Sequence, residues 1–365
     1  MYYFLIIYII SLSVLMTRLS SKKKYIKIKP ISFQLSSNIY WIILFLLPLI
    51  YAAVKRSLNV GSDTAGVYRN IYFGGYAVNH WRPTIYEGLF IQYVKLVYKI
   101  NPKFEFLLGL SVLIICSIFI TYFVLRRKNI NIMISLLVFF VWLYCPSYNV
   151  LRQILAVSCS FIGLVILEKN RPICGVIIFT IASFIHITSI IVFIYYIPYF
   201  FAKKQKWRKI VPLIFLLGPF ITKILITSLI QISFFSKFAE SLQPFNMSNM
   251  NTKFFIFPVM VFPLILLYWN EIIRLDTFNY IHLCGFIFIF TAVFLSGYLW
   301  YAFRMMYYFI PSEAIILGQL GRCCKNRKQR FLVNLYLVVA LLGSFLFVYV
   351  YHDTDGIYPY LFNNL

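Results

Sequence analysis

Long hydrophobic runs separated by short polar segments make up most of the chain. A helix needs about 20 residues to cross a hydrocarbon core of about 30 Å, so runs of this length predict membrane-spanning helices. The fold class that we predict is an all-α polytopic integral membrane protein, with a single membrane domain over residues 1–365. About twelve crossings are expected, near residues 2–17, 38–54, 104–125, 130–146, 150–167, 172–185, 186–201, 210–231, 253–269, 278–300, 305–320 and 331–351.

One hydrophobic region is too long to be a single helix. Residues 130–167 would run about 57 Å at 1.5 Å per residue, far more than the thickness of the core. The polar interruption that follows Cys145 and Pro146 is therefore predicted to be a break between two crossings. This break brings Asn149, Arg152 and Gln153 to one membrane surface.

A second region leaves two alternatives. Residues 172–201 contain no Gly or Pro near their middle, so one tilted helix is an alternative to a hairpin. A single helix would move the basic residues 203–209 to the opposite side and invert everything that follows. We favour a hairpin of two short helices that turns near His186.

The longest polar connection spans residues 55–103. Within it, residues 86–100 form a short, mainly apolar stretch that carries Lys95 and Lys99, which predicts an amphipathic helix at the membrane interface. The stretch 59–76 is the first long polar segment of the chain, and it combines a small-residue turn with one carboxylate and one arginine.

Composition and charge agree with this class. Hydrophobic residues make up 62% of the chain and charged residues only 12%. This composition excludes a soluble domain, because too few polar residues are present to form its surface. A net charge of +24 would suggest a nucleic-acid partner in a soluble protein, but here the basic residues cluster in short loops. Their distribution follows the positive-inside rule if both termini lie outside, so we predict no nucleic-acid partner.

The remaining polar residues gather on the predicted outer face, on loop 55–103, at residues 147–153, at 186, at 301–304 and in the tail 352–360. An arginine beside a membrane segment is costly unless it is paired, binds a ligand or extends to the lipid headgroups. Arg152 and Arg304 stand at the ends of apolar runs, and their guanidinium groups suit phosphate, which accepts paired hydrogen bonds. The seven cysteines show neither metal-ligand spacing nor a disulfide pattern, and no metal or other cofactor is predicted.

Three acidic or basic side chains are candidates for proton transfer, and each has a structural alternative. Asp63 is the leading candidate for a general base, although it also fits a turn after Gly61. Glu87 is a second candidate, or it favours the start of the amphipathic helix. His186 is a third candidate, or a packing residue. The outer tyrosines Tyr68, Tyr72 and Tyr148 are candidates for stacking on sugar rings, or belong to the core and the lipid belt.

Several short motifs occur in an order that resembles a known family. They are Gly61-Ser62-Asp63 with Tyr68; Glu87-Gly88-Leu89-Phe90; Asn149, Arg152, Gln153 and Ala156; Phe184-Ile185-His186; and Arg304, Tyr307 and Tyr308. Together they resemble the EpsG family of polysaccharide polymerases, which are related in role to Wzy-type O-antigen and capsule polymerases. One departure is Ile185, which separates a Phe and a His that the family usually places together.

The resemblance implies a metal-independent glycosyltransferase in the bacterial cytoplasmic membrane that elongates lipid-linked repeat units at its outer face. Its partners would be polyprenyl-pyrophosphate-linked glycans and the lipid bilayer, and a chain-length regulator is left open. The pyrophosphate would bind Arg69, Arg152, Arg304, Gln153 and Arg82.

Two other functional classes remain open. A lipid-linked-oligosaccharide flippase would place charged residues along a central path and show repeat symmetry, and neither is visible in the sequence. The second class is another transferase with the same leaving group, an O-antigen ligase or a membrane acyltransferase; a ligase would have a large outer loop, which the stretch 55–103 allows.

Overall fold

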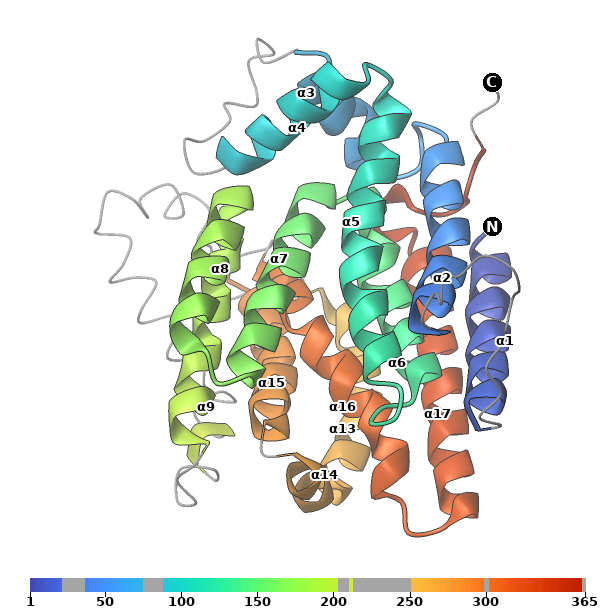
Figure 1. Ribbon diagram of the computed structural model, residues 1–365, viewed down its shortest axis with the longest axis vertical. Helices are drawn as coiled ribbons and strands as arrows, with labels where there is room; N and C mark the ends of the chain where they lie inside the picture. Colours follow the sequence, from blue (N-terminus) through green and yellow to red (C-terminus); the bar gives the residue numbers. More distant parts are fainter. Residues whose placement is uncertain are drawn as a thin grey trace, which may run out of the picture.

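The computed structural model describes residues 1–21, 37–74, 88–202, 210–212, 251–276, 278–298 and 302–362. In these ranges the chain is almost entirely helical (Figure 1), and its α-helices are α1 Tyr2–Ser21, α2 Ser37–Lys55, α3 Arg69–Tyr72, α4 Gly88–Ile100, α5 Phe104–Leu125, α6 Ile132–Phe139, α7 Leu151–Glu168, α8 Pro172–Ile185, α9 Tyr196–Phe201, α13 Ile256–Leu267, α14 Trp269–Leu275, α15 Asn279–Leu295, α16 Ile310–Cys323 and α17 Arg327–Phe345. Short 3₁₀ and π segments extend or connect them, namely η1 Thr64–Tyr68, η3 Phe140–Tyr144, η4 Pro146–Tyr148, η5 Ile187–Tyr195, η7 Thr252–Phe254, η8 Ala302–Tyr308, η9 Leu346–Tyr351 and η10 Thr354–Gly356. The described residues form no strand, only an isolated bridge between Arg56 and Phe362.

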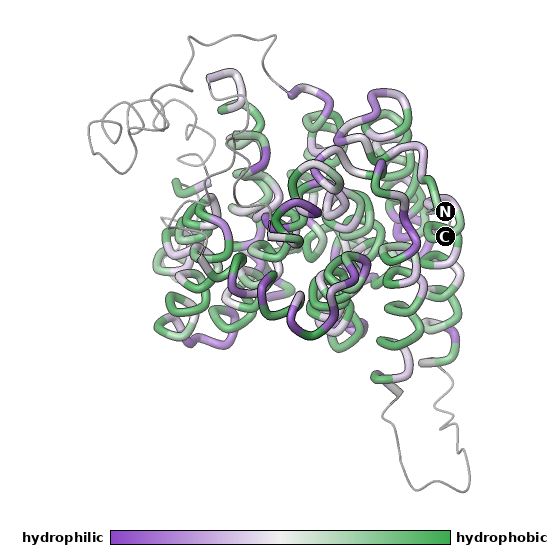
Figure 2. Tube along the Cα trace, turned by 90° about the horizontal axis from the view of Figure 1, so that it is seen from above, coloured by the Kyte–Doolittle hydropathy of each residue, from purple (hydrophilic) through white to green (hydrophobic). Residues whose placement is uncertain are grey.

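The helices form an upright bundle (Figure 1), and many of its large hydrophobic side chains are exposed, among them Phe4, Leu47 and Val339, as a membrane protein requires. Figure 2 shows hydrophobic residues along the helices around the whole bundle. Among the described residues, five helices are long and apolar enough to cross a membrane. The count becomes six if α13 and α14, which meet at a bend of 75°, are taken as one broken span. The prediction of a multi-pass helical membrane protein is thereby confirmed, whereas twelve crossings and outward-facing termini stay predictions, and residues 213–231 of the eighth crossing lie outside the described ranges.

The break predicted in residues 130–167 is confirmed. Helix α6 passes into the π segment η3, the 3₁₀ turn η4 begins at Pro146, and α7 then starts at Leu151. Pro146 lacks an N–H and fixes its own φ, so it suits the first position of a new turn rather than a helix interior. The break presents Asn149 and the start of α7 at one end of the bundle, which we call the site end; it is the upper end in Figure 1.

The hairpin predicted for residues 172–201 is also confirmed. Helix α8 ends at Ile185, His186 is extended with φ −153° and ψ 123°, and the chain returns through η5 and α9. The Tyr196 hydroxyl donates to the carbonyl oxygen of Pro172 at 2.6 Å, which joins the two ends of the hairpin. A single tilted helix is excluded by this contact.

The predicted amphipathic segment forms α4, which lies across the site end of the bundle (Figure 1). Phe90, Val94 and Val97 are buried, and their spacing of four and three residues places them on one face of the helix. The helix and its apolar face are as predicted, and its position at a membrane interface stays a prediction.

The two ends of the chain meet at the site end. The buried Tyr2 hydroxyl donates to the carbonyl oxygen of Ile357 at 3.0 Å, and Ser57 donates its N–H to the carbonyl oxygen of Leu361 at 2.7 Å. Tyr360 donates its hydroxyl to the carbonyl oxygen of Ala52. The C-terminal tail therefore folds back onto the start of loop 55–103 and is part of the packed structure.

A buried polar network joins four helices at the opposite end. Glu168 accepts hydrogen bonds from Arg126 at 2.6 Å and from the Tyr122 hydroxyl at 2.9 Å, and lies 2.9 Å from Nε2 of His282. Nδ1 of His282 lies 3.0 Å from the Ser312 hydroxyl. These groups satisfy one another, as buried polar groups must, and they lie about 24 Å along α7 from Arg152.

Candidate functional site

The amide of Asn149 is the centre of the candidate site. Its Oδ1 accepts hydrogen bonds from the Ser62 hydroxyl and from the backbone N–H of Asp63, each at 2.8 Å. Its Nδ2 donates to Oδ1 of Asp355, also at 2.8 Å. Asn149 is only 2% exposed, so it has little access to water as a substitute partner. One side chain therefore connects loop 55–103, the break before α7 and the C-terminal tail.

Gly61 allows the loop to approach this break closely. It adopts φ +87°, where residues with a side chain are rarely found, and a Cβ added there would lie 2.1 Å from the carbonyl oxygen of Tyr148. That carbonyl accepts the Thr64 hydroxyl at 2.7 Å, while the N–H of Gly61 donates to the carbonyl oxygen of Gly356 at 2.8 Å. The small-residue turn is therefore required where the loop packs between the break and the tail.

The two arginines predicted from the ends of apolar runs converge at the same place. Gln153, in the first turn of α7, donates from Nε2 to the carbonyl oxygen of Arg304 at 2.8 Å and so fixes the backbone of η8 beside α7. The N–H of Arg152 donates to the Tyr68 hydroxyl at 3.4 Å. The Arg152 guanidinium lies 5.8 Å from the centre of the Phe90 ring on α4. Arg152 and Arg304 are half-buried, and Nε of Arg304 is buried without a hydrogen-bond partner in the described part of the chain.

Asp63 faces this cationic pair. Burial raises the pKa of its carboxyl above the ordinary value, and the positive charges of Arg304 and then Arg152 offset part of this rise. Burial also raises the pKa of Tyr68 to about 12, so that its hydroxyl stays protonated at neutral pH. The site thus holds a partly desolvated carboxylate beside two fixed cations.

Asp355 is a second carboxylate in the site, and the sequence patterns did not single it out as a candidate site residue. It lies in η10 with φ +67°, which Asp tolerates better than most residues. Burial raises the pKa of its carboxyl, while Arg304, the Asn149 hydrogen bond and Lys253 lower it, and the charge of Asp63 raises it further. Its Oδ2 is buried and has no hydrogen-bond partner among the described residues. In the sequence, Asp355 was marked by the turn signal Asp-Thr-Asp-Gly at 353–356 and by its place in the polar tail 352–360.

Other predicted site residues lie away from this cluster or outside the described ranges. Arg69 is exposed, and its guanidinium lies 5.9 Å from the Phe73 ring. His186 caps α8 through its N–H and is half-buried; the turn after it contacts η8 through Thr188, whose hydroxyl lies 3.0 Å from that of Tyr308. Arg82 and Glu87 lie outside the described residues.

The three tyrosines proposed to stack on sugars are enclosed by protein. Tyr68 is 4%, Tyr72 3% and Tyr148 0% exposed. The Arg56 guanidinium covers the Tyr148 ring at 4.3 Å, and Tyr72 donates its hydroxyl to the carbonyl oxygen of Asn101. Because a sugar needs an open ring face, these positions argue against stacking, and the three rings instead hold the loop and the break in place.

The arrangement suits the displacement of a phosphate leaving group. Fixed guanidinium groups stabilise charge that develops on phosphate oxygens, and they act most strongly where water is excluded. A carboxylate with a raised pKa beside them can accept a proton from an incoming hydroxyl. Among the described residues, no three His, Cys, Asp or Glu side chains form a group that could hold a metal ion.

Comparison with known proteins gives one match. The model of the EpsG family matches residues 38–362, a range that contains every residue of the cluster described above. No curated protein and no solved structure matches the chain.

Proposed function

The chain belongs to the EpsG family of Wzy-like polysaccharide polymerases, and we propose that it joins polyprenyl-pyrophosphate-linked repeat units into a surface polysaccharide at the outer face of the bacterial cytoplasmic membrane. The proposal rests on one observation in particular: Asp63, Arg152 and Arg304 meet at one end of an apolar bundle. A lipid-linked substrate carries its diphosphate at this depth, where the hydrocarbon core ends.

The reaction that we propose is a glycosyl transfer. The oxygen of an acceptor hydroxyl attacks the anomeric carbon of the donor unit, and the bond from that carbon to the diphosphate oxygen breaks. The electron pair of this bond leaves with the polyprenyl diphosphate, and the hydroxyl proton passes to Asp63. Negative charge grows on the leaving diphosphate during this step, so cations fixed beforehand stabilise the transition state more than the ground state.

Each element of the site has a task in this scheme. Arg152 and Arg304 hold the diphosphate, and Gln153 fixes η8 against α7 through its hydrogen bond to the Arg304 carbonyl. Asn149 orients the backbone of Asp63. Arg69 and Arg82 remain further candidates for the diphosphate, and Glu87 and His186 for proton transfer. The hydrophobic surface of the bundle accommodates the polyprenyl tails.

The decisive experiment is deletion of the gene in the native host, followed by sizing of the lipid-linked glycans. Loss of polymer with accumulation of single repeat units outside the membrane is expected. Single units retained on the inner side would instead indicate a flippase, and finished polymer that fails to reach its final acceptor would indicate a ligase. Either result would refute the proposed function.

Variants then test the arginines. Arg152→Lys and Arg304→Lys keep the charge but lose the planar pair of donors, and each is expected to lower elongation by about a hundredfold at normal protein level. Arg171→Lys is the matched control, because Arg171 is exposed and lies just before α8, at the opposite end of the bundle. Full-length polymer from either site variant would remove that arginine from the diphosphate site.

A further inference from the structure

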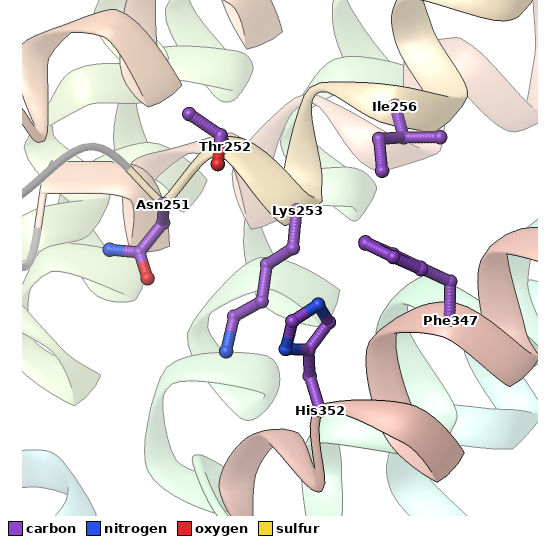
Figure 3. Close-up of a pocket in the computed structure, with 6 residues that line it drawn as sticks. All are labelled: Asn251, Thr252, Lys253, Ile256, Phe347 and His352. Carbon is purple, nitrogen blue, oxygen red and sulfur yellow. The ribbon is translucent and has the colours of Figure 1, made fainter. Parts of the chain in front are cut away.

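A hollow of about 280 Å³ opens between η7 with the start of α13 on one side and η9 with the following His352 on the other. In Figure 3 the Lys253 amine and the His352 imidazole lie next to each other, and Asn251 and Thr252 line the hollow to the left and above. Ile256 and Phe347 supply an apolar side. The volume is near the lower end of the range for small-molecule sites, which leaves room for about one sugar ring.

This hollow adjoins the candidate site. The rings of Phe254 and Phe303 stack at a centroid distance of 4.9 Å, so η7 and η8 are held together. Lys253 precedes Phe254 and Arg304 follows Phe303, which places the two cations on neighbouring segments. From the other side, η10 begins two residues after His352 and carries Asp355, and the charges of both Arg304 and Lys253 act on the Asp355 carboxyl. Asp355 therefore marks the boundary between the hollow and the reaction centre.

The lining has the mixed chemistry that a charged sugar requires. Amide and hydroxyl groups exchange hydrogen bonds with sugar hydroxyls, and an apolar side covers the C–H groups of the ring. Lys253 is half-buried and has no ion-pair partner within 4.0 Å among the described residues. A half-buried ammonium without such a partner favours an anionic group in the hollow.

We propose that the hollow is a saccharide subsite that binds an anionic sugar residue of the glycan, its carboxylate facing Lys253 and its ring lying against Phe347. The subsite rests on the proposed function, because it aligns one sugar of the lipid-linked glycan beside the reaction centre. It also gives a chemical requirement: the polymer that this protein makes contains an anionic sugar.

Binding can be tested on the full-length protein in detergent by saturation-transfer NMR. The probes are D-glucuronate, its neutral methyl ester and D-glucose. The wild type is expected to bind glucuronate at least about tenfold more tightly than the other two, which corresponds to one ion pair of about 1.4 kcal/mol. Lys253→Met should abolish this preference, and Lys253→Arg should keep it. Lys99→Met is the control, since Lys99 is an exposed residue of α4. No preference for glucuronate in the wild type, or an unchanged preference in Lys253→Met, overturns the subsite.

Experiments in the native host separate the subsite from the proposed function. Lys253→Met is expected to shorten the polymer, and sugar analysis of the wild-type polymer should reveal an anionic residue. If gene deletion stops polymer formation but Lys253→Met makes wild-type polymer, or if the polymer contains neutral sugars only, the subsite is wrong and the polymerase assignment stands. If deletion leaves both polymer and lipid-linked glycans unchanged, the polymerase assignment itself fails.

Discussion

The exchange of Asn149 for Asp tests whether the Asn149–Asp355 contact holds the candidate site together. The substitution keeps the size of the side chain and the oxygen that accepts from Ser62 and from the N–H of Asp63. It replaces the group that donates to Asp355 at 2.8 Å with a second carboxylate oxygen. The substitution therefore leaves two hydrogen bonds of residue 149 in place and replaces the third by a contact between two carboxyl groups.

The magnitude follows from electrostatics. Two unit charges 2.8 Å apart repel by about 6 kcal/mol at an effective dielectric constant of 20. Uptake of a proton limits this penalty, because protonating an ordinary Asp at pH 7 costs about 4 kcal/mol. We therefore expect Asn149→Asp to lower the free energy of unfolding by up to about 4 kcal/mol at neutral pH. The new pair has a pKa in the folded state above that in the unfolded state, so the loss shrinks by about 1.4 kcal/mol per pH unit as the pH falls toward 4.

The assay is thermal unfolding of purified protein in detergent, with protein level and polymer length in cells as second readouts. The exchange Asn149→Asp with Asp355→Asn serves as the matched control, because it restores a donor–acceptor pair with the direction reversed. The double variant should be more stable than Asn149→Asp alone at pH 8. If the single variant equals the wild type at pH 8, or if the double variant brings no recovery, the contact does not hold the site.

Three further predictions address the loop, the tail and the base. Gly61→Ala places a Cβ 2.1 Å from the Tyr148 carbonyl oxygen at a positive φ, so thermal stability should fall by about 1–3 kcal/mol or more, whereas Gly66→Ala, with open space around it, should change little. Tyr2→Phe removes a buried hydrogen bond to the tail and should cost about 1 kcal/mol in the same assay; no loss would show that the tail is held by other contacts. Elongation should fall as the pH drops through the raised pKa of Asp63, with a midpoint above the ordinary value for Asp of about 4, and a midpoint at or below that value would contradict the role of Asp63 as base.

The parts of the fold that the sequence predicted depend on local and periodic signals. The length of the region 130–167 required a break, and Pro146 determined where the new turn begins. The turn around Gly61 was visible because few other residue types adopt a positive φ. The order of short motifs then indicated that Asp63, Arg152 and Arg304 act together, and the structure brings these three side chains to one place.

The parts that were missed depend on contacts between distant segments. Asp355 lies 206 residues from Asn149 in sequence, and its place in the site depends on the tail folding back along Tyr2 and Ser57. Glu168 and His282 form a network that no spacing in the sequence reveals, because they lie on different helices. The buried tyrosines show the reverse case: aromatic residues near a polar loop suggest sugar stacking, but packing encloses their rings.

The charges of the site also predict how Asp63 responds to substrate. In the described structure, Arg304 and Arg152 lower the pKa of Asp63 and so oppose the effect of burial. A bound diphosphate would engage both guanidinium groups and add negative charge of its own. The two arginines would then lower the pKa of Asp63 less, and burial would raise it as before. The pKa of Asp63 would therefore rise when the donor binds. A higher pKa makes the carboxylate a stronger base at the moment when the acceptor hydroxyl must lose its proton. Because kcat/KM reports the free enzyme and kcat the complex, the acidic limb of kcat should lie at higher pH than that of kcat/KM. Initial elongation rates measured between about pH 4 and 9 give both limbs. If the acidic limbs of kcat and kcat/KM coincide, diphosphate binding to the arginines does not change the pKa of Asp63.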